Sequence, residues 1–228
     1  MSNHTYFKSL TVITICLVSG LFSCKSIEHY KKVSIADKNS YKVFFNEKER
    51  KPFASYYIIN KEDVEGVVKR KNIFYEDSSC SVATNKDFVK SGYDKGHLKP
   101  AAVSKGSVSE MKESFLLSNV APQYPYFNRV TWRGIEANVR ALLKNQDSLI
   151  VYTGVIYRKR AKRLNKKVEV PYYFYKTILL GDSTATIAFL AKNDSTSVKG
   201  FNYTTTVNII EKLARFDFYP GLNDKLED

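Results

Sequence analysis

Aromatic and β-branched residues gather in five segments of the chain, which is the composition of strands that lie half buried in a sheet. The five segments are residues 41–45 (YKVFF), 54–59 (ASYYII), 148–157, 172–180 and 184–191. Two further segments repeat apolar residues at helical spacing. One follows Asn128 and contains Trp132, Ile135, Val139 and Leu142, and one near the C-terminus contains Val207, Ile210 and Ala214. The pattern predicts an α+β domain with an antiparallel or mixed sheet.

The first hydrophobic segment, residues 9–23, has a different character. It carries no charge, follows Lys8 and ends at Cys24, and its roughly 15 residues fall short of the ~20 that a membrane-spanning helix needs. We interpret it as an export signal. Residues 21–24 (LFSC) resemble the lipobox of bacterial lipoproteins, in which the cysteine is acylated after cleavage, so Cys24 is a candidate lipid anchor. The alternative is an ordinary secretory signal with an incidental cysteine, and either route takes the protein out of the cytoplasm.

No Gly/Ser/Pro-rich linker and no internal repeat divides the rest of the 228-residue chain. We expect a signal peptide at 1–23, a tether at 24–40, one domain at 41–220 and a tail at 221–228. Cleavage before Cys24 would leave two histidines, His29 and His97, which excludes a histidine-based metal cluster. Cys80 has no neighbouring histidine in the sequence, and we expect it to be a small apolar core residue.

Positive charge is concentrated in the middle of the chain. The formal net charge is +13, and removal of Lys8 with the signal gives 13 − 1 = +12. Residues 129–167 contain eleven Lys and Arg against Glu136 and Asp147, or 11 − 2 = +9. Such a field attracts a nucleic acid, and it would equally suit an anionic lipid surface. Residues 158–167 (RKRAKRLNKK) separate two predicted strands, so we expect an exposed hairpin or long loop, either a phosphate contact or a solvated face.

Candidate chemistry lies in SGYDKGH at residues 91–97, in SNVAPQ at 118–123 and in the pattern N-x-x-x-W-x-x-x-E that starts at Asn128. Phosphodiester hydrolysis needs a group that deprotonates water near neutral pH, and His97 is the natural general base. Gly96 beside it would let the backbone turn tightly and a phosphate approach. Asn128 starts the apolar face of its helix and is either an N-cap or a polar group with another partner. Glu136 and Arg140, one turn apart, could form a simple exposed ion pair.

These motifs, in this order and at this separation, resemble the signature of the DNA/RNA non-specific endonuclease family, the endonuclease G-like enzymes. Weaker matches at residues 41–52, 152–155, 170–176 and 202–218 extend the resemblance over most of residues 41–220. The resemblance implies a ββα-metal (His-Me finger) nuclease fold, in which helices flank a central, mostly antiparallel sheet.

The resemblance also implies roles for single residues. His97 would be the general base, and Asn128 the one direct protein ligand of a catalytic Mg²⁺, for which Mn²⁺ is a substitute. Glu136 would bond to the water shell of the metal, and Arg140 would help to bind the phosphate.

Two further residues belong to the predicted site. Lys95 would act on the phosphate as a catalytic and substrate-binding residue, in place of the arginine that the family usually has. Lysine lacks the planar fork that grips two phosphate oxygens at once, so we expect an active enzyme of reduced efficiency. Asn119 would contact substrate or position the His97 loop through hydrogen bonds.

The expected function is an exported, membrane-anchored, Mg²⁺-dependent endonuclease that hydrolyses DNA and RNA to 5′-phosphate and 3′-hydroxyl ends. It would lie in the cell envelope, facing the periplasm or the exterior, with nucleic acid of any sequence and the membrane at Cys24 as partners. Related enzymes are often dimers, so a homodimer is also considered. The alternatives are a nucleic-acid-binding lipoprotein of the same fold with weakened catalysis, and a structural lipoprotein whose basic face meets anionic lipid or polysaccharide.

Overall fold

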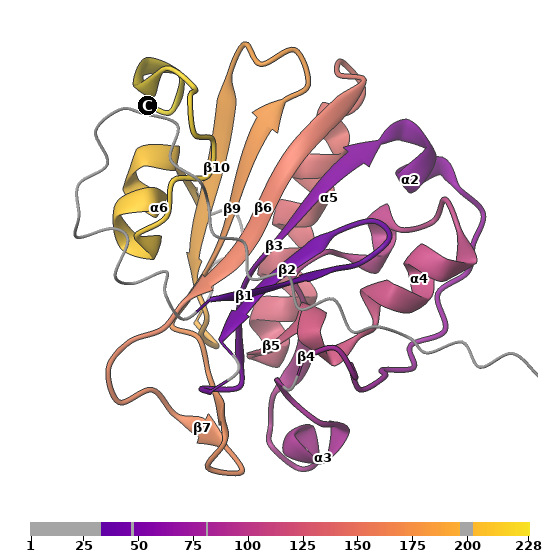
Figure 1. The fold of residues 1–228 in the computed structure, drawn as a ribbon, viewed down its shortest axis with the longest axis vertical. Helices are drawn as coiled ribbons and strands as arrows, with labels where there is room; N and C mark the ends of the chain where they lie inside the picture. The colour runs from indigo at the N-terminus through magenta and orange to yellow at the C-terminus, as the bar shows by residue number, and fades with distance from the viewer. Residues whose placement is uncertain (1–32, 47, 81, 197–202) are drawn as a thin grey trace, which may run out of the picture.

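The structure is a computed structural model that describes residues 33–46, 48–80, 82–196 and 203–228 (Figure 1). Its longer elements are β2 (Lys42–Asn46), β3 (Lys51–Asn60), α4 (Val108–Ser114), α5 (Arg133–Leu142), β6 (Ser148–Ile156), β9 (Tyr173–Leu180), β10 (Thr186–Lys192) and α6 (Val207–Ala214). Its shorter ones are β1 (Ser34–Asp37), α2 (Lys61–Glu65), α3 (Asn85–Phe88), β4 (Asp94–His97), β5 (Val120–Gln123), β7 (Arg163–Leu164), β8 (Val168–Glu169) and β11 (Thr204–Thr205).

A seven-stranded sheet in the order β1-β2-β3-β6-β9-β10-β11 forms the centre of the molecule. Every pair of neighbouring strands in it is antiparallel. The five predicted strands and both predicted helices are present, with ends shifted by a few residues. The α+β fold with a mostly antiparallel central sheet is therefore confirmed.

The two faces of the sheet bury different helices, because successive side chains of a strand point to opposite sides. Along β9, Phe174 and Ile178 belong to the core that contains Trp132, Ile135 and Val139. Tyr175 and Leu179 belong instead to the core that contains Val207, Ile210 and Ala214 of α6. The α5 side carries the cavity described below, and α6 covers the opposite side (Figure 1).

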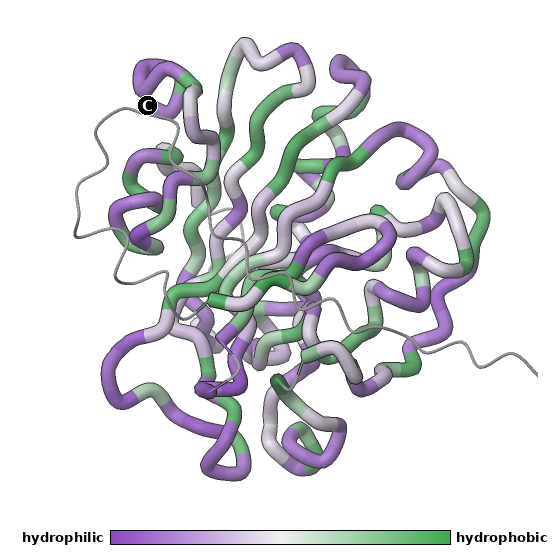
Figure 2. The backbone as a smooth tube through the Cα atoms, viewed as in Figure 1, coloured by the Kyte–Doolittle hydropathy of each residue, from purple (hydrophilic) through white to green (hydrophobic). Residues whose placement is uncertain are grey.

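A separate small core lies at one end of the sheet, where β4 pairs with β5 and β7 pairs with β8. It joins Phe88 of α3 and Tyr93 to Leu164 and Val168 of the β7–β8 hairpin. The predicted exposed hairpin is thus confirmed, and Figure 2 shows its loops among the hydrophilic segments. Because the hairpin shares a core with α3 and Tyr93, its position relative to β4 is fixed.

The fold extends past the predicted domain limits of 41 and 220. β1 lies in the predicted tether and pairs with β2, and the backbone N–H of Asn208 donates to the carbonyl oxygen of Glu227 at 3.3 Å. The predicted signal peptide, Cys24 and His29 lie outside the described residues. Within the described ranges, no helix combines the length and the apolar character that crossing a membrane would need. Cys80 is buried, and burial together with Asp77 raises the pKa of its thiol to about 12.

Candidate active site

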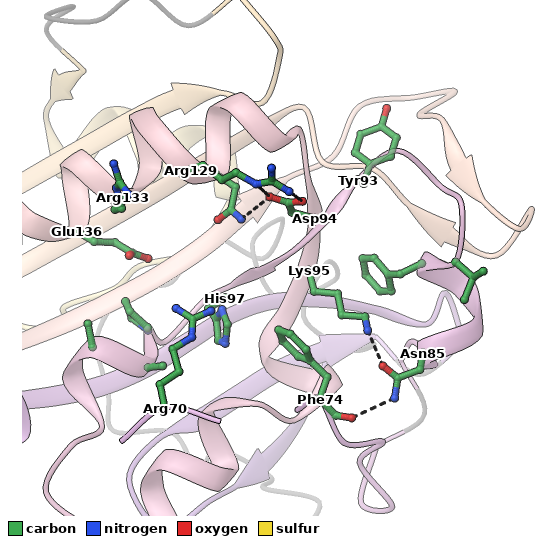
Figure 3. A pocket seen from close by; sticks show the side chains of 16 residues that line it. Arg70, Phe74, Asn85, Tyr93, Asp94, Lys95, His97, Arg129, Arg133 and Glu136 are labelled. Carbon is green, nitrogen blue, oxygen red and sulfur yellow. Dashed lines mark hydrogen bonds and ion pairs between the residues drawn. The ribbon is translucent and has the colours of Figure 1, made fainter. Parts of the chain in front are cut away.

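A cavity of about 630 Å³ opens between β4, α3 and the helix that carries Asn128 and Glu136 (Figure 3). Its basic lining residues outnumber its acidic ones: Arg70, Lys95, Arg129 and Arg133 against Asp94 and Glu136. The structure brings together four of the predicted site residues here, Lys95, His97, Asn128 and Glu136. Arg140 and Asn119 do not line the cavity in the part of the chain that is described.

Asn128 lies in a π-helical turn, Phe127–Trp132, that leads directly into α5. Its backbone N–H donates to the carbonyl oxygen of Tyr124 at 2.9 Å, so the residue is already inside the helix and is not an N-cap. Its Nδ2 donates to Oδ2 of Asp94 at 2.9 Å. Because Nδ2 donates to Asp94 and is not an acceptor, Oδ1 is the atom of this side chain that can accept a bond from water or bind a cation.

Contacts with Arg129 keep the Asp94 carboxylate in place beside the Asn128 amide. Its two carboxylate oxygens also accept bonds from Arg129, from Nε at 2.8 Å and from Nη2 at 2.7 Å. The carboxylate therefore cannot turn away from Asn128 without breaking the fork with Arg129. The start of β4 is fixed in this way to a helix more than 30 residues later in the chain.

His97 ends β4, where pairing with β5 places it opposite Val120. The ring centroids of Phe74 and Phe115 lie 5.2 and 4.9 Å from its imidazole. Among the described residues its Nε2 is buried without a hydrogen-bond partner, which leaves Nδ1 as the nitrogen open to the cavity. Burial, reinforced by the positive charge of Arg70, lowers the pKa of His97 to about 3. The ring is therefore neutral at pH 7 and can accept a proton.

Gly96 has a packing role and does not turn the backbone. It lies inside β4, and the described glycines with positive φ are Gly92 and Gly221. A Cβ atom on Gly96 would stand 2.1 Å from Oε1 of Gln123, whose side chain is fully buried. The prediction of a tight turn at Gly96 is wrong, because the residue lies within a strand. Glycine is required there because a larger side chain would clash with Gln123.

Lys95 reaches across the cavity toward Asn85 of α3 (Figure 3). Its Nζ donates to Oδ1 of Asn85 at 2.6 Å and lies 4.9 Å from the ring centroid of Phe74. Partial burial lowers the pKa of Lys95. The residue thus contributes positive charge to the α3 side of the cavity, held there by Asn85.

Glu136 faces the cavity from α5, two helical turns after Asn128 (Figure 3). It forms no ion pair with Arg140 among the described residues, so the simple surface pair considered above is absent. Burial raises the pKa of the Glu136 carboxyl, against the opposing charges of Lys176, Arg140 and Arg70. Arg140 acts on Glu136 through its charge and from outside the cavity.

Lys176 lies buried behind Glu136, because β9 turns its side chain toward the α5 face together with Phe174 and Ile178. Its Nζ donates to Oγ1 of Thr153 at 2.6 Å and to the hydroxyl of Tyr57 at 3.2 Å. Burial lowers the pKa of Lys176 to about 8. A buried cation next to a buried carboxylate stabilises the charged form of that carboxylate.

Asn119 is a fully buried brace. Its Oδ1 accepts from the backbone N–H of Lys99 and the hydroxyl of Ser55, at 2.8 and 3.0 Å. Its Nδ2 donates to the carbonyl oxygens of Lys99 and Ser114, at 2.8 and 2.9 Å. All the hydrogen bonds that the Asn119 side chain can form are made inside the protein. Asn119 therefore holds the segment after His97 in position and does not contact substrate.

Two arginines that line the cavity, Arg70 and Arg133, could not be assigned a role from the sequence. Arg70 stands beside the His97 ring (Figure 3) and lies 27 residues before it in the chain. Its signal was only the short basic run VKRKN at residues 68–72, which resembles any solvated segment. Arg133 follows Asn128 by five residues and was visible only as part of the general positive charge.

The donor atoms in this cavity fit a hard divalent cation. One amide oxygen, Oδ1 of Asn128, is held in place by Asp94, and the Glu136 carboxylate lines the same cavity. Magnesium keeps most of its water ligands and needs few protein oxygens. A carboxylate in the same cavity could orient those waters.

The β7–β8 hairpin brings further positive charge close to the cavity. Nζ of Lys162 lies 5.0 Å from the ring centroid of Tyr93, which lines the cavity. Nδ2 of Asn165 donates to the carbonyl oxygen of Lys86 in α3 at 3.1 Å. The side chains of Lys159 and Arg160, at the preceding turn, are exposed. The basic segment found in the sequence therefore adjoins the cavity.

Comparison with known proteins adds independent information. The family model described as DNA/RNA non-specific endonuclease matches residues 22–225. A nuclease of Syncephalastrum racemosum is 33% identical over 185 residues, which cover 70% of this chain and 58% of that protein. Mitochondrial endonuclease G of Bos taurus is 36% identical over 121 residues, which cover 47% of this chain and 40% of that protein. The chain thus spans about half the length of these two curated relatives.

A solved structure is similar over most of its length. It is described as a crystal structure of the EndoG/EndoGI complex, and it superimposes with a TM-score of 0.76 at 25% identity. The match covers 84% of this chain and 88% of that one. Together with the sequence matches and the cavity that gathers His97, Asn128 and Glu136, this places the chain in the DNA/RNA non-specific endonuclease family.

Proposed function

We propose that the protein is a Mg²⁺-dependent endonuclease that hydrolyses DNA and RNA to 5′-phosphate and 3′-hydroxyl ends. The observation that carries the proposal is a single cavity in which a neutral histidine and a fixed amide oxygen face the same space. The family membership and the relatives named as nucleases support it.

His97 is the general base in this proposal. A water that donates to Nδ1 loses its proton to the ring as it attacks phosphorus, and the resulting imidazolium is held between Phe74 and Phe115. The depressed pKa keeps the ring free to accept that proton but makes it a weaker base than an exposed histidine. Phosphate binding nearby would raise this pKa and strengthen the base.

The metal would be held by Oδ1 of Asn128, with Glu136 orienting its waters and Asp94 fixing the amide. When bound, Mg²⁺ supplies positive charge to the phosphate and to the departing oxygen. Arg70 and Arg133 line the same cavity and would bind the phosphate oxygens, whereas the fork of Arg129 is engaged by Asp94. These contacts reach the backbone of the nucleic acid and not the bases, so sequence preference should be slight.

Lysine at position 95, where the family usually has arginine, is the feature that favours the alternative, a binding protein with weakened catalysis. Its Nζ is already engaged by Asn85, and a lysine offers one point of charge where an arginine offers a fork. Arg70 and Arg133, which line the same cavity, would supply such a fork in part, which favours the enzyme. Replacing Lys95 by arginine should raise the cleavage rate without changing the metal requirement.

Export and lipid attachment at Cys24 remain part of the proposal and rest on residues 9–24. A tethered nuclease would meet nucleic acid outside the cytoplasm. Cys24→Ser should move the protein from the membrane to the soluble fraction while leaving cleavage intact. Retention of the variant in the membrane would contradict the anchor.

The test of function is cleavage of plasmid DNA and of RNA by the purified protein with Mg²⁺, with Mn²⁺ and with a chelator. We expect both substrates to be degraded only with metal, and His97→Gln to lower the rate by about 10²–10⁴-fold, as loss of a general base does. Asn119→Ala removes the hydrogen bonds that hold the segment after His97, so it should lower the melting temperature. Wild-type cleavage by His97→Gln would refute the mechanism, and metal-independent cleavage would refute the metal.

A further inference from the structure

A second cavity lies on the other side of the sheet, between α6 and the end of the chain. Its volume is about 230 Å³, and acidic residues dominate its lining: Glu211 of α6, Asp217 in the following loop, and Asp224 and Glu227 near the C-terminus. Figure 1 shows the end of the chain beside α6. The proposed catalytic function uses none of these residues.

Three of these carboxylates converge. One oxygen each from Glu211, Asp217 and Glu227 lies within 4.8 Å of the others. Glu227 is only 5% exposed, yet its Oε1 has no hydrogen-bond partner among the described residues. A buried carboxylate oxygen without a donor is costly, and it points to a ligand that the protein itself does not supply.

The charge of this cluster is not balanced by nearby lysine or arginine. The chain as a whole carries +13, but none of the ion pairs among the described residues includes Glu211, Asp217 or Glu227. Burial, and then the negative charges of Glu227 and Asp217, raise the pKa of Glu211 to about 7. The pKa values of Asp217 and Glu227 are raised for the same reasons.

Hydrogen bonds hold in place the segments that carry the three carboxylates. Oε1 of Glu211 accepts from the backbone N–H of Phe218 at 2.8 Å, which fixes the loop that carries Asp217 to α6. Asn208, in the first turn of α6, binds the other end: its Nδ2 donates to Oδ1 of Asp228 at 2.8 Å, and its backbone N–H bonds to Glu227. The site is therefore largely formed before any ligand arrives.

We propose that Glu211, Asp217 and Glu227 bind a calcium ion that fastens the C-terminal segment to α6. Carboxylates are the ligands that hard divalent cations prefer, and three oxygens that all lie within 4.8 Å of one another can be shared by one Ca²⁺ at its usual bond lengths of about 2.3–2.6 Å. The larger coordination shell of Ca²⁺ would be completed by water in the open part of the cavity. With one exposed ligand, Asp217, the affinity should lie in the weak range of extracellular calcium sites, about 10⁻⁴–10⁻³ M.

The test is thermal unfolding of the full chain with and without about 10 mM Ca²⁺, a tenfold excess over the weak limit of about 10⁻³ M. Mass action then raises the melting temperature by about 3–6 °C for a protein of this size. We expect the same rise in Asn128→Ala, which lacks the amide oxygen of the active-site cavity, and in Glu65→Gln, which removes an exposed carboxylate elsewhere. Glu227→Gln and Glu211→Gln should lose it.

Terbium luminescence gives a second readout that does not depend on stability. Tb³⁺ binds calcium sites, and Tyr219 lines this cavity, so tyrosine excitation of Asn128→Ala should give emission that Ca²⁺ displaces. Tyr219→Phe should lower the emission while Ca²⁺ still raises the melting temperature. The proposal is overturned if Ca²⁺ does not stabilise the wild-type chain, if Asn128→Ala abolishes the effect, or if Glu227→Gln retains it.

Discussion

Asp94 offers the sharpest test of how the metal-binding amide is positioned. Its carboxylate accepts one bond from Nδ2 of Asn128 and two from Arg129, so Asp94→Ala frees the amide to rotate about its side-chain bonds. Loss of a residue that orients a metal ligand typically lowers metal affinity about 10–100-fold, which corresponds to roughly 1.4–2.7 kcal/mol. The apparent Mg²⁺ constant for cleavage should rise by that factor.

The same change should have little effect on folding. The Arg129 side chain is 67% exposed, and such surface pairs add little to stability. The bond between Asp94 and Asn128 contributes about 1 kcal/mol, which is a few degrees in melting temperature. A large shift in metal dependence with a small shift in stability is therefore the signature of positioning.

The assay is the initial rate of plasmid cleavage across a series of Mg²⁺ concentrations for wild type, Asp94→Ala and Arg129→Gln. Arg129→Gln removes the fork but leaves the bond between Asp94 and Asn128, so it should shift the Mg²⁺ constant less than Asp94→Ala does. The reasoning is refuted if Asp94→Ala keeps the wild-type Mg²⁺ constant, or if saturating metal fails to restore any of its lost rate.

Three other predictions concern charge. The folded pKa of His97 lies below its unfolded value of 6.5, so its contribution to stability is complete above pH 6.5 and falls as pH drops toward 3. Urea denaturation should therefore show that the difference in free energy of unfolding between wild type and His97→Gln falls by about 2 kcal/mol from pH 6.5 to 4.5. Lys176→Met removes a cation beside Glu136 and should raise the carboxyl pKa, so the acid limb of the rate profile moves to higher pH, whereas Lys176→Arg should move it less. Replacing Lys159 and Arg160 with Gln, in protein that carries His97→Gln so that DNA is not cleaved, should weaken DNA binding. The dependence of log affinity on log salt concentration should become less steep by about 0.9 for each phosphate that the hairpin no longer neutralises. An unchanged slope would exclude the hairpin from the nucleic-acid interface.

The main sheet and two helices could be predicted from the sequence because their signals are local. Residues 172–180 form an almost continuous aromatic and aliphatic run, which indicates a strand, and Trp132, Ile135 and Val139 already form one stripe. The short β4 could not be recognised in this way, because four residues of mixed polarity (DKGH) carry no periodic pattern. Its place in the fold follows from pairing with β5, more than 20 residues later.

The identity of His97 as a candidate base also came from the sequence, through the chemistry of its side chain, and that of Asn128 and Glu136 came through the resemblance of their motif to the family signature. Their state did not. The low pKa of His97 depends on Phe74, Phe115 and Arg70, and the orientation of Asn128 depends on Asp94. Burial, desolvation and hydrogen bonding are set by segments that meet only in the folded chain, so the tertiary structure decided which atom of each residue faces the cavity and in which protonation state.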